Sequence, residues 1–164
     1  MPFDEMFVLL FEAQFPRLFR YLDRLSGEPD LAADLAQEAF IRLYRRGTMP
    51  ERPELWLVTV ALNLFRNWRS TSSRRLRLLA RWSEPAQAAE PSSGRSEESD
   101  AAAPVRIALG KLSARDREML LLRAEGYSYR DIATALGLNQ ASIGTLLARA
   151  KRAFQEAYGR FDAS

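Results

Sequence analysis

The sequence predicts an all-α protein, in which an N-terminal domain of three to four helices and a C-terminal helix-turn-helix domain of four helices are joined by a flexible linker. Apolar residues recur at three- and four-residue steps in both halves of the chain, as in amphipathic helices. Between the halves, residues 84–103 contain Pro, Ser, Ala and acidic residues but no large apolar side chain, so this segment cannot offset the entropy lost on ordering. We therefore expect domains at residues 1–83 and 104–164, with residues 84–103 as the linker.

Three helices are expected in the N-terminal domain, or four if the third is interrupted. The first covers about residues 4–25, and Pro16 either kinks it or lies at an early break. The second covers residues 31–46 with Asp30 as its cap. Its buried side is expected to comprise Ala32, Leu35, Ala36, Ala39, Phe40 and Leu43. The third begins near Glu54, after the loop 47–53, and the Ser and Thr residues at 70–73 are expected to interrupt or end it.

The third helix contains the most informative surface of the chain. Its buried stripe is expected to hold Leu57, Val60, Ala61, Leu64 and Trp68. The opposite stripe is expected to hold Trp56, Thr59, Asn63, Arg66, Asn67 and Ser70. An exposed ring, amides and cations suit a nucleic acid, because cations bind phosphate, amides read base edges and rings stack on bases. An ordinary solvated basic face would have the same composition.

The distribution of charge also favours a polyanion as partner. The chain has a net charge of only +3, but residues 55–83 carry six Arg and no acid, and residues 104–164 carry ten basic and six acidic residues. The acidic segment 84–103 separates these basic blocks. This arrangement indicates two places that meet a polyanion.

The composition excludes several other classes of protein. The chain has no Cys and no His, which removes disulfides, thiolate metal sites and the commonest general base and metal ligand. No apolar run reaches the length of a membrane span, and the first residues lack the basic start of a signal peptide. We therefore expect a cytoplasmic protein whose work is binding, without catalytic residues, metal or cofactor.

The C-terminal domain contains a predicted helix-turn-helix. Ser113, Ser128 and Asn139 are expected to cap three successive helices, and Gly137 forms the turn before the last one. With the small Ala133 at the crossing, this order is typical of the DNA-binding motif whose second helix enters the major groove. The outward positions early in that helix are Gln140, Ala141, Ser142, Thr145 and Arg149, with Lys151 and Arg152 able to reach phosphate. A helical hairpin that binds no DNA is the alternative.

Three segments of the chain carry a resemblance to a known family. They are DLAQEAFIRLYR (residues 34–45), WLVTVALNLFRNWRS (residues 56–70) and LGKLSARDREMLLLRAEGYSYRDIATALGLNQASIGTLLARAKRAF (residues 109–154). In this order they resemble the polymerase-binding segment, the promoter-melting helix and the second domain of the extracytoplasmic-function (ECF, group 4) sigma factors of bacterial RNA polymerase. The resemblance implies a protein that binds core RNA polymerase and directs promoter recognition and DNA melting.

The resemblance implies a role for each motif. Binding to the clamp of the largest polymerase subunit is implied for Asp34, Gln37, Glu38, Ile41 and Arg42. Binding to the minus-ten element is implied for Asn63, Arg66, Asn67, Arg69, Arg74 and Arg75. In this role Asn63 helps to read a flipped base, and Asn67 and the loop 47–53 complete the pocket for that base. The four arginines hold phosphates. Binding to the minus-35 element is implied for Arg130, Ser142, Thr145, Arg149 and Arg152. The linker would follow the RNA exit path, an anti-sigma factor is a further candidate partner, and the free protein is expected to be a monomer.

Some features depart from the family's pattern. Gly144 and Leu146 stand where the family often has Lys and Arg, so two DNA contacts are expected to be lost, and Gly144 costs about 1 kcal/mol of helix propensity. The loop 47–53 is short for a base-reading loop, and Trp56 either packs the helix start, which is favoured, or walls the base pocket.

The alternative functions are a dimeric helix-turn-helix regulator that binds duplex DNA alone, a scaffold that binds only protein, and an enzyme, for which the sequence offers no nucleophile–base pair, phosphate loop or metal cluster.

Overall fold

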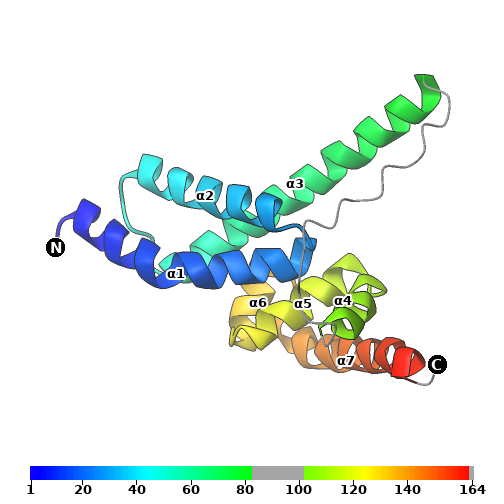
Figure 1. Cartoon of the computed structure of the whole chain (residues 1–164). Coiled ribbons are helices and arrows are strands. Elements are labelled where there is room, and N and C mark those ends of the chain that lie inside the picture. The colour runs from blue at the N-terminus through cyan, green and yellow to red at the C-terminus, as the bar shows by residue number, and fades with distance from the viewer. Residues whose placement is uncertain (83–101, 163–164) are drawn as a thin grey trace.

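The computed structural model describes residues 1–82 and 102–162, which form seven helices and no strand (Figure 1). The helices are α1 (Phe3–Ser26), α2 (Pro29–Arg46), α3 (Pro53–Trp82), α4 (Ala103–Gly110), α5 (Ala114–Ala124), α6 (Tyr129–Leu136) and α7 (Gln140–Asp162). We call α1–α3 the first unit and α4–α7 the second unit. The all-α fold class is confirmed, whereas the expected linker lies almost wholly outside the described residues.

The first turn between helices shows how local sequence sets helix ends. α1 continues through Pro16 without a break and ends at Gly27, which adopts the left-handed conformation with φ of 71° and donates its N–H to the Asp23 carbonyl at 2.8 Å. α2 starts at Pro29, so the prediction of Asp30 as its cap was wrong. The fixed φ of proline suits the first helical position, and Asp30 lies in the first turn, where its charge favours the helix N-terminus.

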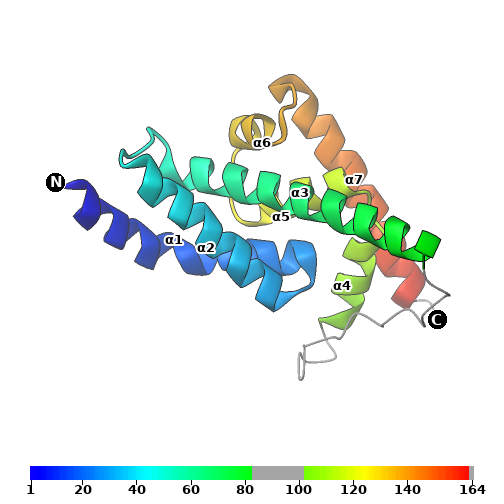
Figure 2. The same ribbon diagram turned by 90° about the horizontal axis from the view of Figure 1, so that it is seen from above.

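α1 and α2 run antiparallel, and α3 crosses both of them (Figures 1 and 2). The predicted buried side of α2 is confirmed at all six positions. Its small residues let α1 and α3 approach closely, while Phe40 and Leu43 fill the space between the three helices. From α1, Tyr21 and Leu22 are fully buried in the same core.

α3 is a single helix of 30 residues, so the expected interruption at residues 70–73 was wrong. Arg and Leu residues of high helix propensity follow the Ser and Thr residues and continue the helix. Phe65 is the last buried residue of α3, and the remainder extends away from the body (Figure 1). Trp68, expected in the buried stripe, is 39% exposed because it lies beyond this point, where its ring stacks on Phe65.

The capping predictions for the second unit are confirmed. The Ser113 and Ser128 hydroxyls accept the backbone N–H of the residue three positions later, at 3.2 and 3.1 Å, and Asn139 Oδ1 accepts that of Ala141 at 3.1 Å. Gly137 turns the chain between α6 and α7 with a φ of 67°. Both helices pack on a core that contains Met119, Leu122, Ile132, Ile143 and Leu147.

The two units pack against each other, α1 against α5 and α3 against α6 (Figure 2). Buried apolar residues of both units belong to one continuous cluster. Tyr21 of α1 donates its hydroxyl to the Glu118 carbonyl of α5 at 3.2 Å, and burial raises the pKa of this hydroxyl well above its ordinary value. Over residues 1–82 and 102–162, no helix has the length and apolarity that a membrane crossing requires.

Candidate nucleic-acid interface

The outward face of α2 carries the five residues predicted to bind polymerase. Asp34, Gln37 and Ile41 are exposed, and Ile41 has 43% of its surface accessible. Glu38 and Arg42 form an ion pair one helical turn apart, with an Oε1–Nε distance of 3.2 Å. The structure therefore places these side chains together on one face of one helix, which is the arrangement that a partner helix can contact.

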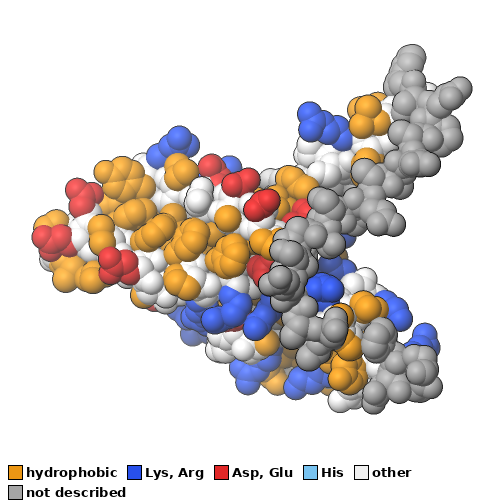
Figure 3. All heavy atoms as spheres, in the orientation of Figure 1, with side chains coloured by type: hydrophobic (Ala, Val, Ile, Leu, Met, Phe, Trp, Pro, Cys, Tyr) orange, Lys and Arg blue, Asp and Glu red, His pale blue; other side chains and the backbone are white. Residues whose placement is uncertain are grey.

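An apolar groove of about 370 Å³ adjoins this face. It is lined by Phe7 and Phe11 of α1 and by Phe40, Ile41 and Tyr44 of α2. The rings pack edge to face, with centroids 5.3 Å apart for Phe7 and Tyr44 and 5.0 Å apart for Phe11 and Phe40. Figure 3 shows apolar side chains gathered over α1 and α2 on this side of the molecule. The polar face of α2 thus continues into an exposed aromatic surface.

The start of α3 presents two amides to solvent. Asn63 and Asn67 are both exposed, one turn apart, as the sequence predicts. Thr59 is directed toward its own helix, because its hydroxyl donates to the carbonyl four residues earlier at 2.7 Å. Trp56 is half-buried against the core, with the Arg46 guanidinium 5.7 Å from its ring centroid. The ring therefore packs the helix start, and the two amides are left to face a ligand.

The arginines of α3 fall into two groups. Arg69, Arg74 and Arg75 are exposed, and the Arg69 guanidinium lies 5.7 Å from the Phe65 ring centroid. Arg66 instead reaches the second unit, where its Nη2 lies 2.5 Å from Oε2 of Glu118 and its Nε lies 3.4 Å from Oε1. This hydrogen bond raises the pKa of Arg66. Arg66 is thus engaged by a carboxylate in the position where a phosphate ligand was expected.

The loop between α2 and α3 is also tied to the second unit. Both terminal nitrogens of Arg52 donate to the Asp131 carboxylate of α6, one of them at 2.8 Å. The hydrogen bond from Arg52 lowers the pKa of Asp131 below its ordinary value. The loop expected to complete a base pocket is therefore held against the helix-turn-helix.

The predicted minus-35 residues lie on the surface of the second unit. All five are exposed, namely Arg130 on α6 and Ser142, Thr145, Arg149 and Arg152 on α7. Leu146, by contrast, packs on the core and does not occupy an outward position. A Cβ on Gly144 would lie 3.6 Å from Cε2 of Tyr129, which is ordinary van der Waals contact.

Sequence reasoning missed the carboxylates at the boundary between the units. The side chains of Glu118, Glu125 and Asp131 are only 3%, 5% and 10% exposed, and all three pair with arginines of the first unit. Glu118 lies one turn before the buried Leu122, and a charge on the apolar side of a helix requires a partner. That signal was present in the sequence, but it does not identify the partner. Within the described residues, no group of three or more His, Cys, Asp or Glu could hold a metal ion.

Comparison with known proteins identifies the family. The family model for Sigma-70 region 2 matches residues 10–75, and that for Sigma-70 region 4 matches residues 104–154. The chain is 34% identical to the ECF RNA polymerase sigma factor EcfG of Rhodopseudomonas palustris over 149 residues, which cover 86% of this chain and 77% of that relative. The chain belongs to the ECF sigma factor family.

Other relatives of this ECF sigma factor are longer. The chain is 37% identical over 144 residues to the "Probable RNA polymerase sigma factor RfaY" of Xanthomonas campestris pv. campestris. These residues cover 81% of this chain and 36% of that relative. The chain spans 55% and 58% of two further curated relatives. Among solved structures, the sigma factor RpoE of Bartonella quintana, crystallised in complex with the anti-sigma factor NepR, matches with a TM-score of 0.74 and 25% identity, covering 93% of this chain and 96% of that one.

Proposed function

We propose that this ECF sigma factor binds core RNA polymerase and directs promoter recognition and opening for transcription initiation. The observation that carries the proposal is the pair of exposed amides, Asn63 and Asn67, followed along α3 by exposed arginines. Unstacking a base costs a few kcal/mol, and capture of the extruded base by amides offsets that cost without a chemical step. Binding alone therefore suffices for promoter opening, and no catalytic group is required.

Each surface has a place in this proposal. The outward face of α2, residues 34–42, docks on the clamp of the largest polymerase subunit. Asn63 and Asn67 receive a flipped base of the minus-ten element, and Arg66, Arg69, Arg74 and Arg75 hold the phosphates around it. The second unit reads the minus-35 element with Ser142, Thr145 and Arg149, while Arg130 and Arg152 contact the DNA backbone. Two units that bind two elements of one promoter reinforce each other by effective concentration.

An anti-sigma factor is proposed as a second protein partner. The related RpoE was crystallised with the anti-sigma factor NepR, which supports a partner of this class. The exposed face of α2 and the adjoining aromatic groove are the surfaces that such a partner would cover to exclude polymerase. These partners are found in the cytoplasm, where we expect the protein to act.

Reconstituted transcription tests the proposed function. Core enzyme with this protein is expected to give promoter-dependent transcripts from a library of upstream regions, and core enzyme alone is expected to give none. The alternative, a dimeric regulator that binds duplex DNA without polymerase, is not favoured by the comparisons. Light scattering that shows a dimer, together with tight duplex binding and no transcript, would establish that alternative instead.

A further inference from the structure

A basic hollow of about 460 Å³ lies between the middle of α3 and the start of α5. Its lining from α3 comes from one helix face, because the residues recur at steps of three and four, namely Arg66, Arg69, Ser70 and Ser73. The second unit contributes Ala114, Arg115, Glu118 and Leu136. A volume of this size lies within the range of about 300–1,000 Å³ that small-molecule sites occupy, so the hollow can accept a small ligand.

Positive charge is in excess in the hollow. Three of its lining residues are arginines, and Glu118 is the single carboxylate among them. Arg66 donates to both oxygens of that carboxylate, so this pair is neutral as a whole. Within residues 1–82 and 102–162, no ion pair involves Arg69 or Arg115. Two guanidinium charges in the hollow are therefore uncompensated by carboxylates of the described chain.

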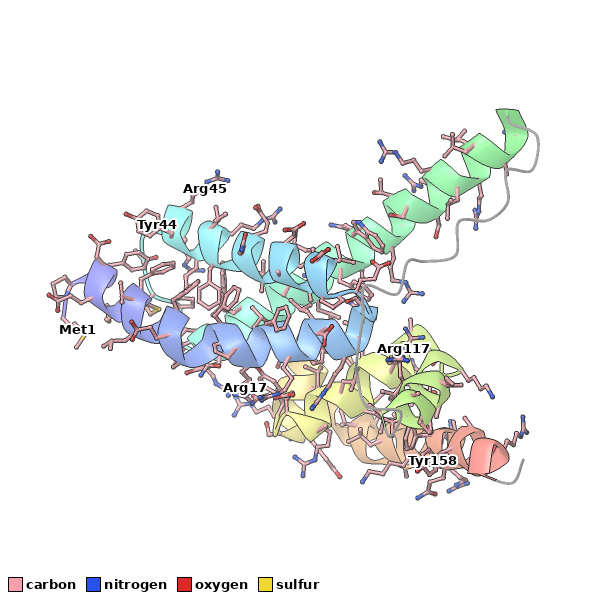
Figure 4. All side chains as sticks on the ribbon, in the orientation of Figure 1. Met1, Arg17, Tyr44, Arg45, Arg117 and Tyr158 are labelled. Carbon is pink, nitrogen blue, oxygen red and sulfur yellow. The ribbon has the colours of Figure 1, made fainter. Side chains whose placement is uncertain are left out.

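A further arginine adds to this excess. Arg117 donates to the carbonyls of Leu109 and Leu112, at 3.0 and 3.4 Å, and these acceptors carry no full charge. Burial lowers the pKa of Arg117, and the nearby charge of Arg69 lowers it further. Figure 4 shows Arg117 at the edge of the second unit nearest to the outgoing part of α3. An anion between the two units would offset this repulsion between cations.

The position of Arg115 is unfavourable for the helix that carries it. Arg115 is exposed in the first turn of α5, where the aligned peptide dipoles give a partial positive charge. Asp116, next to it, has the sign that suits this end, and its N–H is capped by the Ser113 hydroxyl. A cation at this end does not help α5 to form. An anion in the hollow would interact favourably with both the Arg115 guanidinium and the helix N-terminus.

We propose that this hollow is a binding site for an oligophosphate, a chain of two or more phosphoryl groups that is either free or attached to a nucleoside. Arg69 and Arg115 bind phosphate oxygens from opposite sides, and guanidinium groups match such oxygens in a bidentate manner. The hydroxyls of Ser70 and Ser73 are further donors on the same side as Arg69. A single phosphoryl group is too small to contact both sides, whereas a chain of them spans the hollow.

The site goes beyond the proposed function and does not depend on it. Because Arg69 is also a proposed minus-ten contact, an oligophosphate bound here would occupy a donor that promoter DNA uses. Arg115, Ser70 and Ser73 have no part in the proposed DNA contacts. They therefore allow the site to be tested by itself.

Isothermal titration calorimetry of the free, full-length protein tests the site. The probes are inorganic tripolyphosphate, ATP, GTP and AMP, without divalent cations, at about 0.15 M KCl, which screens non-specific attraction. Tripolyphosphate and the two triphosphates are expected to bind one to one. AMP should bind at least about tenfold more weakly, because it lacks the phosphoryl groups that reach the second side.

The same titrations identify the source of the phosphoryl groups. Equal affinities for tripolyphosphate, ATP and GTP would support the site with a free oligophosphate as its ligand. An affinity for ATP or GTP that exceeds that for tripolyphosphate by about tenfold or more would support it with a nucleotide. The proposal is overturned if none of the three probes saturates the protein, or if AMP binds as tightly as ATP.

A matched pair of arginines locates the binding. Arg115→Gln should weaken tripolyphosphate binding by about tenfold, because one charge-assisted contact is lost. Arg160→Gln, an exposed arginine near the end of α7 that does not line the hollow, makes the same charge change and should leave the affinity unaltered. The melting temperature of Arg115→Gln is expected to be no lower than that of the wild type, since its charge opposes the helix dipole. Equal affinities of the two variants would overturn the proposal.

A second pair uses added charge and covers the case in which Arg115→Gln fails to fold, as judged by circular dichroism. Ser73→Glu places a carboxylate in the hollow and should weaken tripolyphosphate binding by about tenfold or more. Thr71→Glu is the control, because Thr71 is exposed two residues earlier and about 200° away around α3. Equal weakening by the two glutamates would assign the binding to overall charge and overturn the site.

These measurements need neither polymerase nor promoter DNA, so their failure differs from a failure of the proposed function. A protein that binds tripolyphosphate in the hollow but supports no transcription would refute the sigma-factor role alone. A protein that drives transcription but binds none of the probes would refute the oligophosphate site alone.

Discussion

Arg66 on α3 and Glu118 on α5 form a hydrogen-bonded ion pair with an Nη2–Oε2 distance of 2.5 Å, although 52 residues separate them in the sequence. The pair is asymmetric, because the Arg66 side chain is 39% exposed while that of Glu118 is 3% exposed. Loss of the arginine leaves a buried carboxylate without its charged partner, whereas loss of both charges leaves a neutral contact.

We expect Arg66→Ala to lower the free energy of unfolding by about 1–3 kcal/mol, the range for a buried polar group that loses its partner. The double variant Arg66→Ala/Glu118→Gln should lose less than the sum of the single changes, because the charge that needs a partner is gone. Urea denaturation measures both. Arg75→Ala, on the exposed part of α3, is the control and should stay within about 0.5 kcal/mol of the wild type. If Arg66→Ala and Arg75→Ala lowered the free energy of unfolding equally, the buried Glu118 carboxylate would not depend on Arg66 as its partner.

Below about pH 9, the stability of the packed molecule should depend on pH only in acid. The pKa values of Asp131 and Glu125 lie below their ordinary values of 3.8 and 4.5, because Arg52 and Arg20 donate hydrogen bonds to the carboxylates. A carboxyl whose pKa is lowered by folding stabilises the fold fully above its ordinary pKa, and this contribution is lost as pH falls through the lowered value.

The free energy of unfolding is therefore expected to be nearly constant between about pH 6 and 9, since the chain has no His, and to fall below about pH 4. Urea denaturation at each pH measures this profile. The variant Glu125→Gln/Asp131→Asn should show a shallower fall in acid, and an equally steep fall would assign the pH dependence to other carboxyls.

Ile41 and Ile107 allow a matched test of polymerase docking. They are 43% and 41% exposed, Ile41 on the outward face of α2 and Ile107 on α4. Ile41→Ser should weaken binding to core polymerase by about 1–2 kcal/mol, because less apolar surface is buried at the interface, and Ile107→Ser should not. Fluorescence anisotropy with labelled protein measures the two affinities. Equal effects would show that the face of α2 is not the docking surface.

Asn63→Ala should impair promoter opening more than duplex binding. The exposed amide is proposed to contact a base only after that base leaves the stack, and such contacts are worth about 1–3 kcal/mol. Permanganate footprinting measures opening, and a gel shift of duplex promoter DNA measures binding. Gln155→Ala removes an exposed amide of α7 and serves as the control. Equal loss of opening and of binding in the Asn63 variant would contradict the melting role.

Gly144→Ala is expected to stabilise the protein by up to about 1 kcal/mol, because alanine has the higher helix propensity. The added Cβ would meet Cε2 of Tyr129 at 3.6 Å, an ordinary contact that requires no movement. Thermal unfolding measures the change. Gly159→Ala, also in α7 but with no atom near its added Cβ, should give a smaller gain because the end of the helix frays. A loss of stability at residue 144 would show that Tyr129 cannot accommodate the methyl group.

Local patterns predicted most of the fold. The buried side of α2 and the caps at Ser113, Ser128 and Asn139 follow from spacing within a few residues, and each is confirmed. The same reasoning failed where two local signals compete, as at Asp30, where the preceding proline sets the helix start. It also failed at Trp68, because periodicity cannot show where a long helix leaves the core.

The boundary between the units could not be predicted in the same way. Its ion pairs join residues 52 to 108 positions apart, and no helical period connects such residues. Arg66 was correctly predicted to face outward from the first unit, but it pairs there with Glu118 of the second unit. The charges and shapes of the two helical units in three dimensions decide which of their surfaces meet.

The continuous helix α3 fixes the distance between two of its proposed DNA contacts. At 1.5 Å per residue, the backbone holds Asn63 and Arg75 about 18 Å apart along the axis, close to the rise of five base pairs of B-DNA. The main-chain hydrogen bonds of the helix maintain this spacing, since no described residue of α3 after Phe65 is buried. One inserted residue between them would rotate the distal guanidiniums by about 100° around the helix, so the register of α3 acts as a ruler that sequence length alone can reset.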